Sequence, residues 1–549
     1  MDTLTIIWIA LPLFVGFSIY LLPKLSRGLA LLVSLVSLAY GLWYAFSAEP
    51  LTLELIDSFG VSLFVDQLSG FFILTNAVVT AAVILYCWSS GKGAFFYTQA
   101  IILHGSVNSV FLCADLISVY VALEVIGIAA FLLIVYPRTD RSIWVGLRYL
   151  FVSNTAMLFY LLGTALVYQA TRSFSFAALE NAPTEAIALI FIGLLAKGGI
   201  FVSGLWLPLT HGESESPVSA LLSGAVVKTG VFPLVRFALI LPELDPLVRL
   251  FGVLTALFGV AFAVFAKDTK RILAFHTISQ LGFILAAPAV GGFYALTHGL
   301  VKSALFLIAG KLPSRDLKFL KKHPIPTSLW IALAIASFSI SGFPLLSGFG
   351  AKVLTTKNLL PWQVIGMNVA AFGTAVSFAK FIFLPHEPSL AFSNGAAANG
   401  LSLNGTASNG TANNGTASNG ASLNGAAAHG TANNGAAVHA SADSSSGNSS
   451  GNSSGNRSSA SSIPQPGVSF WLAIVVLLGG LVLANVFYYD AYSLENIVKP
   501  LVTIGLGWAA YLLIFQKLSV KLPRVAEQFD HLIGAMSLML MLLFWMVLA

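Results

Sequence analysis

LLAKGGIFVSGLWLP, residues 194–208, places one charged side chain inside an otherwise apolar stretch. Gly198 and Gly199 directly follow this charged residue, Lys197. Pro208 ends the segment. Glycine and proline weaken or interrupt helices, so the stretch predicts a helix that is broken at membrane depth. Such breaks are tolerated where the backbone lines protein or water, and they are common at ion sites.

The composition of the chain predicts an all-α, polytopic membrane protein. Of its 549 residues, 57% are hydrophobic and only 9% are charged, whereas soluble domains have about 25% charged residues. Apolar runs of about twenty residues, enough to cross a bilayer core, recur along the chain. We expect 14–16 transmembrane helices, centred near residues 13, 38, 78, 104, 125, 157, 196, 228, 257, 281, 301, 340, 373, 479, 507 and 540.

The basic residues predict the orientation in the membrane. Eighteen Lys and Arg residues lie in odd-numbered connections between the expected helices and only four in even-numbered ones. The odd connections are therefore expected to be cytoplasmic, with both termini outward. The basic residues behind the net charge of +6 therefore indicate membrane topology, and they do not form a face that would bind nucleic acid. Cys87 and Cys113 give neither a metal pattern nor a disulfide pattern.

A possible internal repeat relates two parts of the chain. Residues 94–240, shifted by 152 to 155 positions, overlay residues 246–390. Five helices in each unit, an odd number, would give two inverted repeats, each forming one half-channel. The overlay brings three pairs of ionisable residues together: Lys197 with Lys352, Lys228 with Lys380, and Glu124 with His276.

These patterns define five segments. The stretch at 391–466 is rich in Asn, Gly, Ala and Ser and has no apolar face to bury, so we expect a disordered cytoplasmic linker. Neutral repeat expansion explains it better than a functional tether. The expected segments are N-terminal transmembrane helices (1–93), the first repeat (94–240), the second repeat (246–390), the linker (391–466) and C-terminal transmembrane helices (467–549).

Charged residues near the middle of apolar helices predict a route for protons or small ions. A charge at the bilayer centre costs about 2.5 to 3.5 kcal/mol on insertion scales, so it is kept for a reason. The residues concerned are Glu124, Lys197, Lys228, Lys302 and Lys352.

Snorkelling to the lipid headgroups is the alternative for a lysine or arginine near a helix end. It stays open for Lys352, which lies in SISGFPLLSGFGAK (339–352), a second stretch with helix-breaking glycines and a proline. It is the preferred interpretation for Arg236 and Lys380.

Glu124 is either a neutral core acid or the partner of a buried lysine. In a pair, each charge favours the ionised form of the other, while desolvation opposes both. Moving such a pair apart would change the proton affinity of the lysine strongly. Lysine suits this role because it can release its proton, which arginine cannot do.

Histidines supply possible relay groups beside the lysines. His298 lies four residues before Lys302, hence on the same helical face. His276 lies in a polar stretch and is a further relay candidate, with His104 a weaker one. A lone helix histidine is more often a satisfied core residue. His211 is expected at the cytoplasmic mouth beside two glutamates.

Four ordered motifs resemble the antiporter-like subunits shared by Mrp-type cation/proton antiporters and respiratory complex I. They are GLWLPLTHGESESPVSALLSGAVVKTGVFPLVR (204–236), KDTKRILAFHTISQLGFIL (267–285), THGLVKSALFLIAGKL (297–312) and SISGFPLLSGFGAK. The resemblance implies that Glu124, Lys197, Lys228, His298, Lys302 and Lys352 form a chain of protonatable groups across two half-channels.

Two departures from the family pattern are visible. Glu213 and Glu215 add negative charge before PVSALLSG, and the repeat-rich linker is not typical of the family. The absence of a long lateral helix after the fifteenth helix also argues against the largest, distal complex I subunit.

The functional hypothesis is a proton-translocating subunit of an Mrp-type Na⁺/proton antiporter in a bacterial plasma membrane or thylakoid membrane. Its partners would be other membrane subunits, protons and Na⁺. The alternatives are a proton-pumping subunit of a complex I-like oxidoreductase and an ion-coupled subunit of an inorganic-carbon uptake complex. No flavin, quinone, Fe–S or nucleotide motif appears, so we expect no cofactor, no metal and no enzymatic activity of its own.

Overall fold

The computed structural model describes residues 2–47, 49–56, 60–387, 466–486, 488, 491–517, 534, 537–541 and 543–545. The predicted linker up to residue 465, and part of the predicted helix near residue 540, lie outside the described residues. The five-segment division and the inverted repeat stay predictions.

The described chain is helical and polytopic, as the composition predicts. Helices α4 (Ala94–Leu112), α12 (Thr269–Ala286), α15 (Thr327–Ser341) and α16 (Ser347–Lys357) also belong to the fold. Twelve further segments of the described residues are long and apolar enough to cross a membrane: α1 (Asp2–Leu21), η1–α2 (Pro23–Phe46), α3 (Gln67–Cys87), α5 (Leu116–Ile134), α6 (Asp140–Thr171), α7–α8 (Thr184–Glu213), α9–α10 (Ser216–Ile240), α11 (Asp245–Phe265), η5–α13 (Pro288–Ala309), η6–α17 (Pro361–Ile382), α18 (Val468–Val486) and α19–η8 (Leu494–Phe515).

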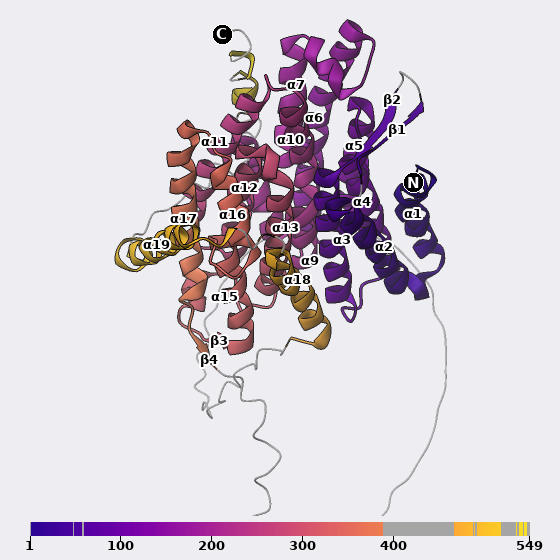
Figure 1. Cartoon of the computed structure of the whole chain (residues 1–549). Helices are drawn as coiled ribbons and strands as arrows, with labels where there is room; N and C mark the ends of the chain where they lie inside the picture. The colour runs from indigo at the N-terminus through magenta and orange to yellow at the C-terminus, as the bar shows by residue number, and fades with distance from the viewer. Residues whose placement is uncertain are drawn as a thin grey trace, which may run out of the picture. The chain divides into compact units, whose positions relative to one another are not determined.

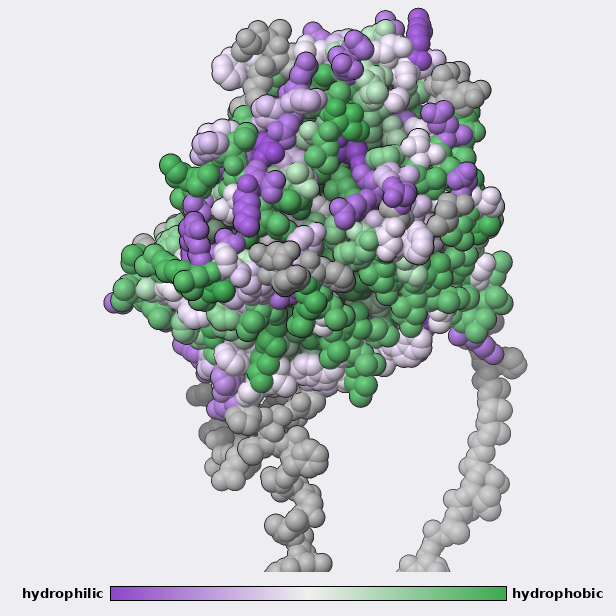
Figure 2. Space-filling view, viewed as in Figure 1, coloured by the Kyte–Doolittle hydropathy of each residue, from purple (hydrophilic) through white to green (hydrophobic). Residues whose placement is uncertain are grey.

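The helices that carry Lys228 and Lys302 lie at the centre of this bundle. Segments α9–α10 and η5–α13 are wholly buried over their apolar windows, whereas only 28%, 33% and 17% of the windows of α1, α18 and α19–η8 are buried. Helix α13 packs against α3, α9, α12, α15 and α16, and Figure 1 shows it among them. Figure 2 shows large hydrophobic areas over α18 and α19 and a separate concentration of hydrophilic side chains above them.

Short polar side chains fix where several helices begin. Asp66, Asp115 and Asp268 accept hydrogen bonds from backbone N–H groups in the first turns of α3, α5 and α12. These caps satisfy donors that have no partner inside the helix. Asp115 also accepts from the Ser62 N–H at 2.9 Å, which connects strand β2 (Gly60–Val65) to α5.

A β-hairpin between α2 and α3 was not predicted. Strands β1 (Leu51–Ile56) and β2 (Gly60–Val65) pair antiparallel, with Leu51 opposite Val65. The alternation LTLELI in β1 has the period of two that is typical of a strand, so the signal was present. A second, parallel pair joins β3 (Ile325–Pro326) to β4 (His386–Glu387).

Candidate functional site

The first broken helix exposes backbone carbonyls beside Lys197. Helix α7 (Thr184–Gly198) ends at Gly199, whose φ of +70° is readily adopted only by glycine. The Leu195 carbonyl accepts from the Ser203 hydroxyl at 3.0 Å, and the Ala196 carbonyl accepts from the Trp206 indole N–H at 2.9 Å. The break is therefore satisfied by side chains of the following turn.

Lys197 is held by neutral oxygen atoms. It is only 3% exposed, and its Nζ donates to the Leu123 carbonyl at 2.8 Å and to the Ser153 hydroxyl at 2.6 Å. Gly127 makes room for this ammonium, because a Cβ there would lie 3.2 Å from Nζ. A cation in the last turn of α7 is also stabilised by the helix dipole.

Glu124 acts on Lys197 through its charge, while the lysine hydrogen bonds go elsewhere. Its side chain is only partly buried. Val121 and Ile128, one turn before and after it on α5, are 55% and 53% exposed. Glu124 thus lies between the lysine and an outer face of this chain, and not in the centre of the bundle.

Lys228 binds carbonyl groups of a π-helical turn. The turn η4 (Leu222–Val226) lies between α9 (Ser216–Leu221) and α10 (Lys228–Ile240). Such single π-turns are frequent at functional sites. The fully buried Lys228 ammonium donates to the Ser223 carbonyl at 3.1 Å and to the Gly224 carbonyl at 2.6 Å.

Hydrogen bonds to shared residues bring Lys228 and Lys302 together across four elements, α10, η4, α12 and α13. The Ser223 hydroxyl and the Thr277 hydroxyl are 2.8 Å apart. The Thr277 hydroxyl donates to the Leu273 carbonyl at 3.1 Å, and the Lys302 ammonium donates to the same carbonyl. All four side chains are fully buried, so they form a polar line in the apolar core, in which each lysine is bonded to a backbone carbonyl and the two hydroxyls are bonded to each other.

Lys302 lies at the centre of a group of histidines. Its charge acts on His211, His276 and His298. The ring nitrogens of these three buried histidines have no hydrogen-bond partner within the described residues. His211 stacks on Phe306 with ring centroids 4.6 Å apart. Buried polar atoms without partners are costly, and water is the usual partner at such places.

The second broken helix holds Lys352. Helix α15 ends at Gly342, with φ of +85°, and α16 begins at Ser347. Ser341 is the last residue of α15, and its carbonyl accepts a hydrogen bond from the Lys352 ammonium at 3.1 Å. The ammonium also lies 5.6 Å from the Phe283 ring centroid. Lys352 is partly buried, so it is neither in the deep core nor on an open surface.

A small cavity joins Lys352 to the histidine group. It measures about 10 Å³, the order of space that one water molecule needs, and His298 and Lys352 both line it. Tyr294 and Gln280 line it too, and the tyrosine hydroxyl donates to the glutamine oxygen at 2.7 Å. Two polar side chains that line this cavity are thus held in place by a hydrogen bond to each other.

Among the described residues, no hydrogen bond connects Lys197 to Lys228. Here the backbones of α7 and α10 meet, and a Cβ on Gly230 would overlap the backbone of Gly198. The two lysines therefore stand on helices in backbone contact, with no side-chain hydrogen bond between them among the described residues.

The two broken helices have matching landmarks. Both α7 and α15 have 15 residues and end at a glycine with positive φ. Lys197 precedes its break, whereas Lys352 follows its break. Lys197 thus belongs to the helix before its break, and Lys352 belongs to the helix after its break. The inverted repeat stays a prediction.

Two expectations about peripheral residues were wrong. His211 was placed at a mouth beside Glu213 and Glu215, but its ring is fully buried. The two glutamates instead pair with surface cations: Glu215 with Lys92 at 2.7 Å, and Glu213 with Arg141 at 3.5 Å.

Arg236 was expected to snorkel and instead forms a buried ion pair. Its guanidinium binds both oxygens of Asp66 at 2.5 and 2.8 Å and donates to the Ser69 hydroxyl at 3.0 Å. The reason is the nearby carboxylate at the start of α3. Burial alone would raise the pKa of Asp66, but the hydrogen bonds and charge of Arg236 hold it below its usual value. The pair therefore stabilises the fold at neutral pH, and this contribution is lost as the pH falls through the acid range.

Replacing Arg236 by Ala should lower stability clearly. Asp66 would keep a partly buried charge without its partner, and breaking such a pair costs about 3 kcal/mol. Thermal unfolding of the purified protein in detergent measures the loss. Lys499→Ala is the matched control, because the Lys499–Glu495 pair is exposed by 71% and 74% and should contribute little. Equal melting temperatures for both variants would contradict the assignment.

Two predicted residues remain. His104 is a satisfied core histidine: its ring nitrogens lie 3.1 Å from the Thr80 hydroxyl and 2.8 Å from the Ser37 hydroxyl. Lys380 was expected to snorkel but is only 7% exposed, because its ammonium donates to the Ala263 and Ala266 carbonyls. It lies near enough to His276 for its charge to act on that histidine.

Sequence reasoning missed the hydroxyl groups that join the charged residues. Ser153, Ser223 and Thr277 contact lysines or connect them, as described above. Ser223 and Thr277 both lie inside motifs that the sequence analysis quotes, so their polarity in apolar helices was a usable signal.

Sequence comparisons place the chain beside membrane subunits of two kinds. A family model described as "NADH:quinone oxidoreductase/Mrp antiporter, TM" matches residues 113–377, which contain every predicted relay residue. The chain is 30% identical to a subunit of the Na(+)/H(+) antiporter of Alkalihalophilus pseudofirmus over 397 residues, 64% of this chain and 80% of that protein. It is also 30% identical to a subunit of the NADH-quinone oxidoreductase of Desulforudis audaxviator over 441 residues, 69% of this chain and 85% of that protein.

Two solved structures have a similar fold. A chain of the membrane-bound sulfane sulfur reductase, an archaeal respiratory membrane complex, matches with a TM-score of 0.64 and 22% identity, covering 72% of this chain and 91% of that chain. A chain of the Mrp complex from Dietzia sp. matches with a TM-score of 0.63 and 22% identity, covering 70% and 80%.

Proposed function

Because the chain belongs to the NADH:quinone oxidoreductase/Mrp antiporter family of membrane proteins, we propose that it is a proton-translocating subunit of an Mrp-type Na⁺/proton antiporter. It would work within a multisubunit membrane assembly. The observation that carries the proposal is the buried line from Lys228 through Ser223 and Thr277 to Lys302.

The pathway begins at Glu124 and Lys197. A proton taken up from one side of the membrane resides on Lys197 while the carboxylate is near, since the negative charge stabilises the ammonium. If the Glu124 carboxylate moves away from Lys197, or if water enters between them, the ammonium loses this stabilisation and releases its proton more readily. The partly exposed position of Glu124 on α5 makes it reachable from outside the core of this chain.

The proton then passes through the central polar line. Lys228 and Lys302 are the charged groups at its two ends, and Ser223 and Thr277 are hydroxyl groups that can both donate and accept. Because the two lysines donate to backbone carbonyls, which only accept, transfer between a lysine and a hydroxyl requires a water molecule or a side-chain rotation. His276 and His298, beside Lys302, are further acceptors. The small cavity between His298 and Lys352 leads to the second break, where the proton leaves.

Thr277→Val should slow transport without stopping it. Valine has nearly the same shape but lacks the hydroxyl, so Ser223 loses its partner and the line is interrupted. A lost hydrogen bond of about 1.4 kcal/mol corresponds to about a tenfold lower rate. Proton uptake by inverted membrane vesicles measures the effect, and Thr277→Ser should restore most of the activity. An unchanged rate in Thr277→Val would remove this hydroxyl from the pathway.

A complex I-like assembly is the second candidate, favoured by the equal identity to the NADH-quinone oxidoreductase relative. In that case the same pathway would be driven by electron transfer in other subunits. Purifying the assembly and recording its Fe–S absorbance separates the two candidates. Absorbance together with quinone reduction favours the oxidoreductase, whereas its absence together with Na⁺-dependent proton movement favours the antiporter.

For either candidate, the distribution of basic residues predicts that both termini face outward. Cysteine labelling with a membrane-impermeant reagent tests this orientation through residues introduced near position 22 and near position 320, in two connections that should face the cytoplasm. Labelling of both in inverted vesicles only is the expected result.

A further inference from the structure

A second cavity, of about 170 Å³, lies outside the proposed pathway. It is formed by residues at the end of α11, in the loop around α14 (Leu317–Leu320), at the end of α17, and in and after the π-turn η8 (Tyr511–Phe515). Its charged lining residues are all lysines: Lys267, Lys318, Lys321, Lys380 and Lys517. None of its twelve lining residues is acidic, so the cavity favours an anion.

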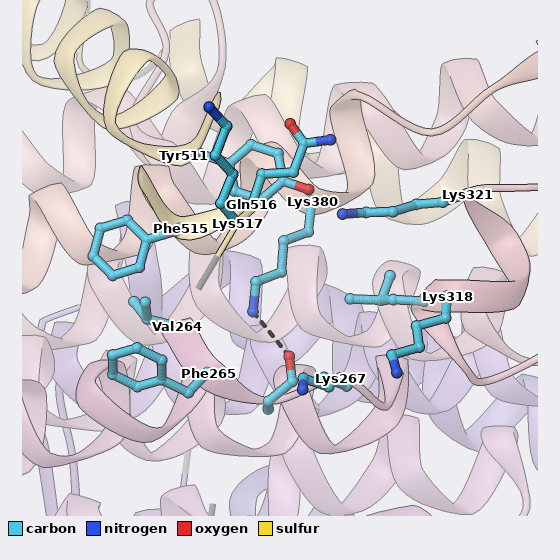
Figure 3. A pocket seen from close by; sticks show the side chains of 12 residues that line it. Val264, Phe265, Lys267, Lys318, Lys321, Lys380, Tyr511, Phe515, Gln516 and Lys517 are labelled. Carbon is cyan, nitrogen blue, oxygen red and sulfur yellow. Dashed lines mark hydrogen bonds between the residues drawn. The ribbon is translucent and has the colours of Figure 1, made fainter. Parts of the chain in front are cut away.

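Lys380 lines this cavity from the end of α17. It is 7% exposed, and its ammonium donates to the Ala263 carbonyl at 3.0 Å and to the Ala266 carbonyl at 2.9 Å. An ammonium has three N–H groups, and within the part of the chain that the structure describes these two carbonyls accept from two of them. Figure 3 shows Lys380 reaching between Tyr511 and Lys321 to the Ala266 carbonyl.

The charges around Lys380 reinforce the preference for an anion. Lys321 and Lys267 lie near enough for their charges to act on Lys380. The Lys321 ammonium is 5.5 Å from the Tyr511 ring centroid. Like charges gathered around one space repel one another, and a bound anion offsets that repulsion. Lysine binds phosphate as a compact point charge.

The rest of the lining is apolar and continues onto an exposed surface. Val264, Phe265, Leu317 and Phe515 line the cavity beside the lysines. Next to Phe515 on η8, three exposed apolar side chains extend this surface: Leu512 (43%), Leu513 (71%) and Ile514 (53%). A ligand with an anionic group and attached hydrocarbon chains fits this combination better than a free anion does.

The expected orientation agrees with such a ligand. Lys267, Lys318 and Lys321 lie in connections that the distribution of basic residues assigns to the cytoplasmic side. Anionic lipids give that leaflet a negative surface potential, and basic pockets between transmembrane helices bind their headgroups.

We propose that this cavity binds the phosphodiester headgroup of an anionic phospholipid, with Lys380 and Lys321 on the phosphate and the acyl chains along η8. The lipid anchors the C-terminal helix α19–η8 to α11 and α17. The cavity shares no lining residue with the small cavity between His298 and Lys352, so the proposal does not depend on which assembly the chain belongs to.

Native mass spectrometry of the purified, delipidated assembly tests the proposal. The probes are phosphatidylglycerol, phosphatidylcholine with the same acyl chains, and inorganic phosphate. Wild-type protein should retain phosphatidylglycerol in preference to phosphatidylcholine. Lys321→Gln should weaken retention by about fivefold and the Lys321→Gln/Lys380→Gln double variant by about 25-fold, from about fivefold per lysine.

Lys322→Gln is the matched control, because Lys322 is exposed and adjacent in sequence but does not line the cavity. It should leave lipid retention unchanged. Equal retention of the two lipids, or equal effects of Lys321→Gln and Lys322→Gln, would overturn the proposal. Displacement of the lipid by inorganic phosphate alone would assign a free anion instead. Loss of a co-purifying protein from Lys321→Gln, with lipid retention unchanged, would assign the site to an acidic partner.

Discussion

Lys197→Ala should reduce proton transport to the level of vesicles that lack the protein. Alanine removes the ammonium that the Leu123 carbonyl and the Ser153 hydroxyl hold beside Glu124. The proposed pathway then has no group that can carry the proton between Glu124 and Lys228. Quenching of a pH-sensitive dye in inverted vesicles measures transport, and blue native electrophoresis shows whether the assembly remains intact.

Lys197→Arg separates a titrating group from a merely positive one. Arginine keeps the charge but does not release its proton at ordinary pH, so transport should be lost in this variant too. The matched control is Lys357→Ala, an exposed lysine at the end of α16, which should transport normally. Normal transport in Lys197→Arg would show that the position needs charge alone.

Lys302→Met should also stop transport while leaving the fold intact. Methionine keeps the length of the side chain but removes the charge that acts on His211, His276 and His298. It also removes the end of the polar line that begins at Lys228. The Lys302 ammonium is bonded to a backbone carbonyl and not to a carboxylate, so its removal leaves no buried counter-charge behind and assembly should persist.

The control for Lys302→Met is Lys322→Met, at an exposed position remote from the histidines. Dye quenching and thermal unfolding are recorded on both variants. Transport at the wild-type rate in Lys302→Met would place the proton route elsewhere. A large fall in melting temperature with loss of the complex would instead assign Lys302 a structural role.

The broken helices and the buried lysines could be predicted from local sequence. Gly199 and Gly342 have the positive φ angles that end α7 and α15. Lys228 and Lys302 lie within apolar sequence on both sides, and both are fully buried. These features depend on residues near one another in the chain, which a single sequence displays.

Contacts between distant helices could not be predicted in this way. The Arg236–Asp66 pair joins residues 170 positions apart, and the Ser223–Thr277 contact joins residues 54 positions apart. Both depend on how helices rotate and pack, which local periodicity does not fix. The partial exposure of Glu124 likewise follows from the position of α5 at an outer face.

A high-resolution experimental map of the purified assembly in lipid tests the central claim most directly. The account predicts ordered water that joins Lys197 to Lys228 across the Gly198–Gly230 contact, and water in the cavity between His298 and Lys352. It also predicts water on the ring nitrogens of the histidines around Lys302. Dry gaps at both places, or a Lys352 ammonium that faces lipid, would contradict a continuous proton pathway through this chain.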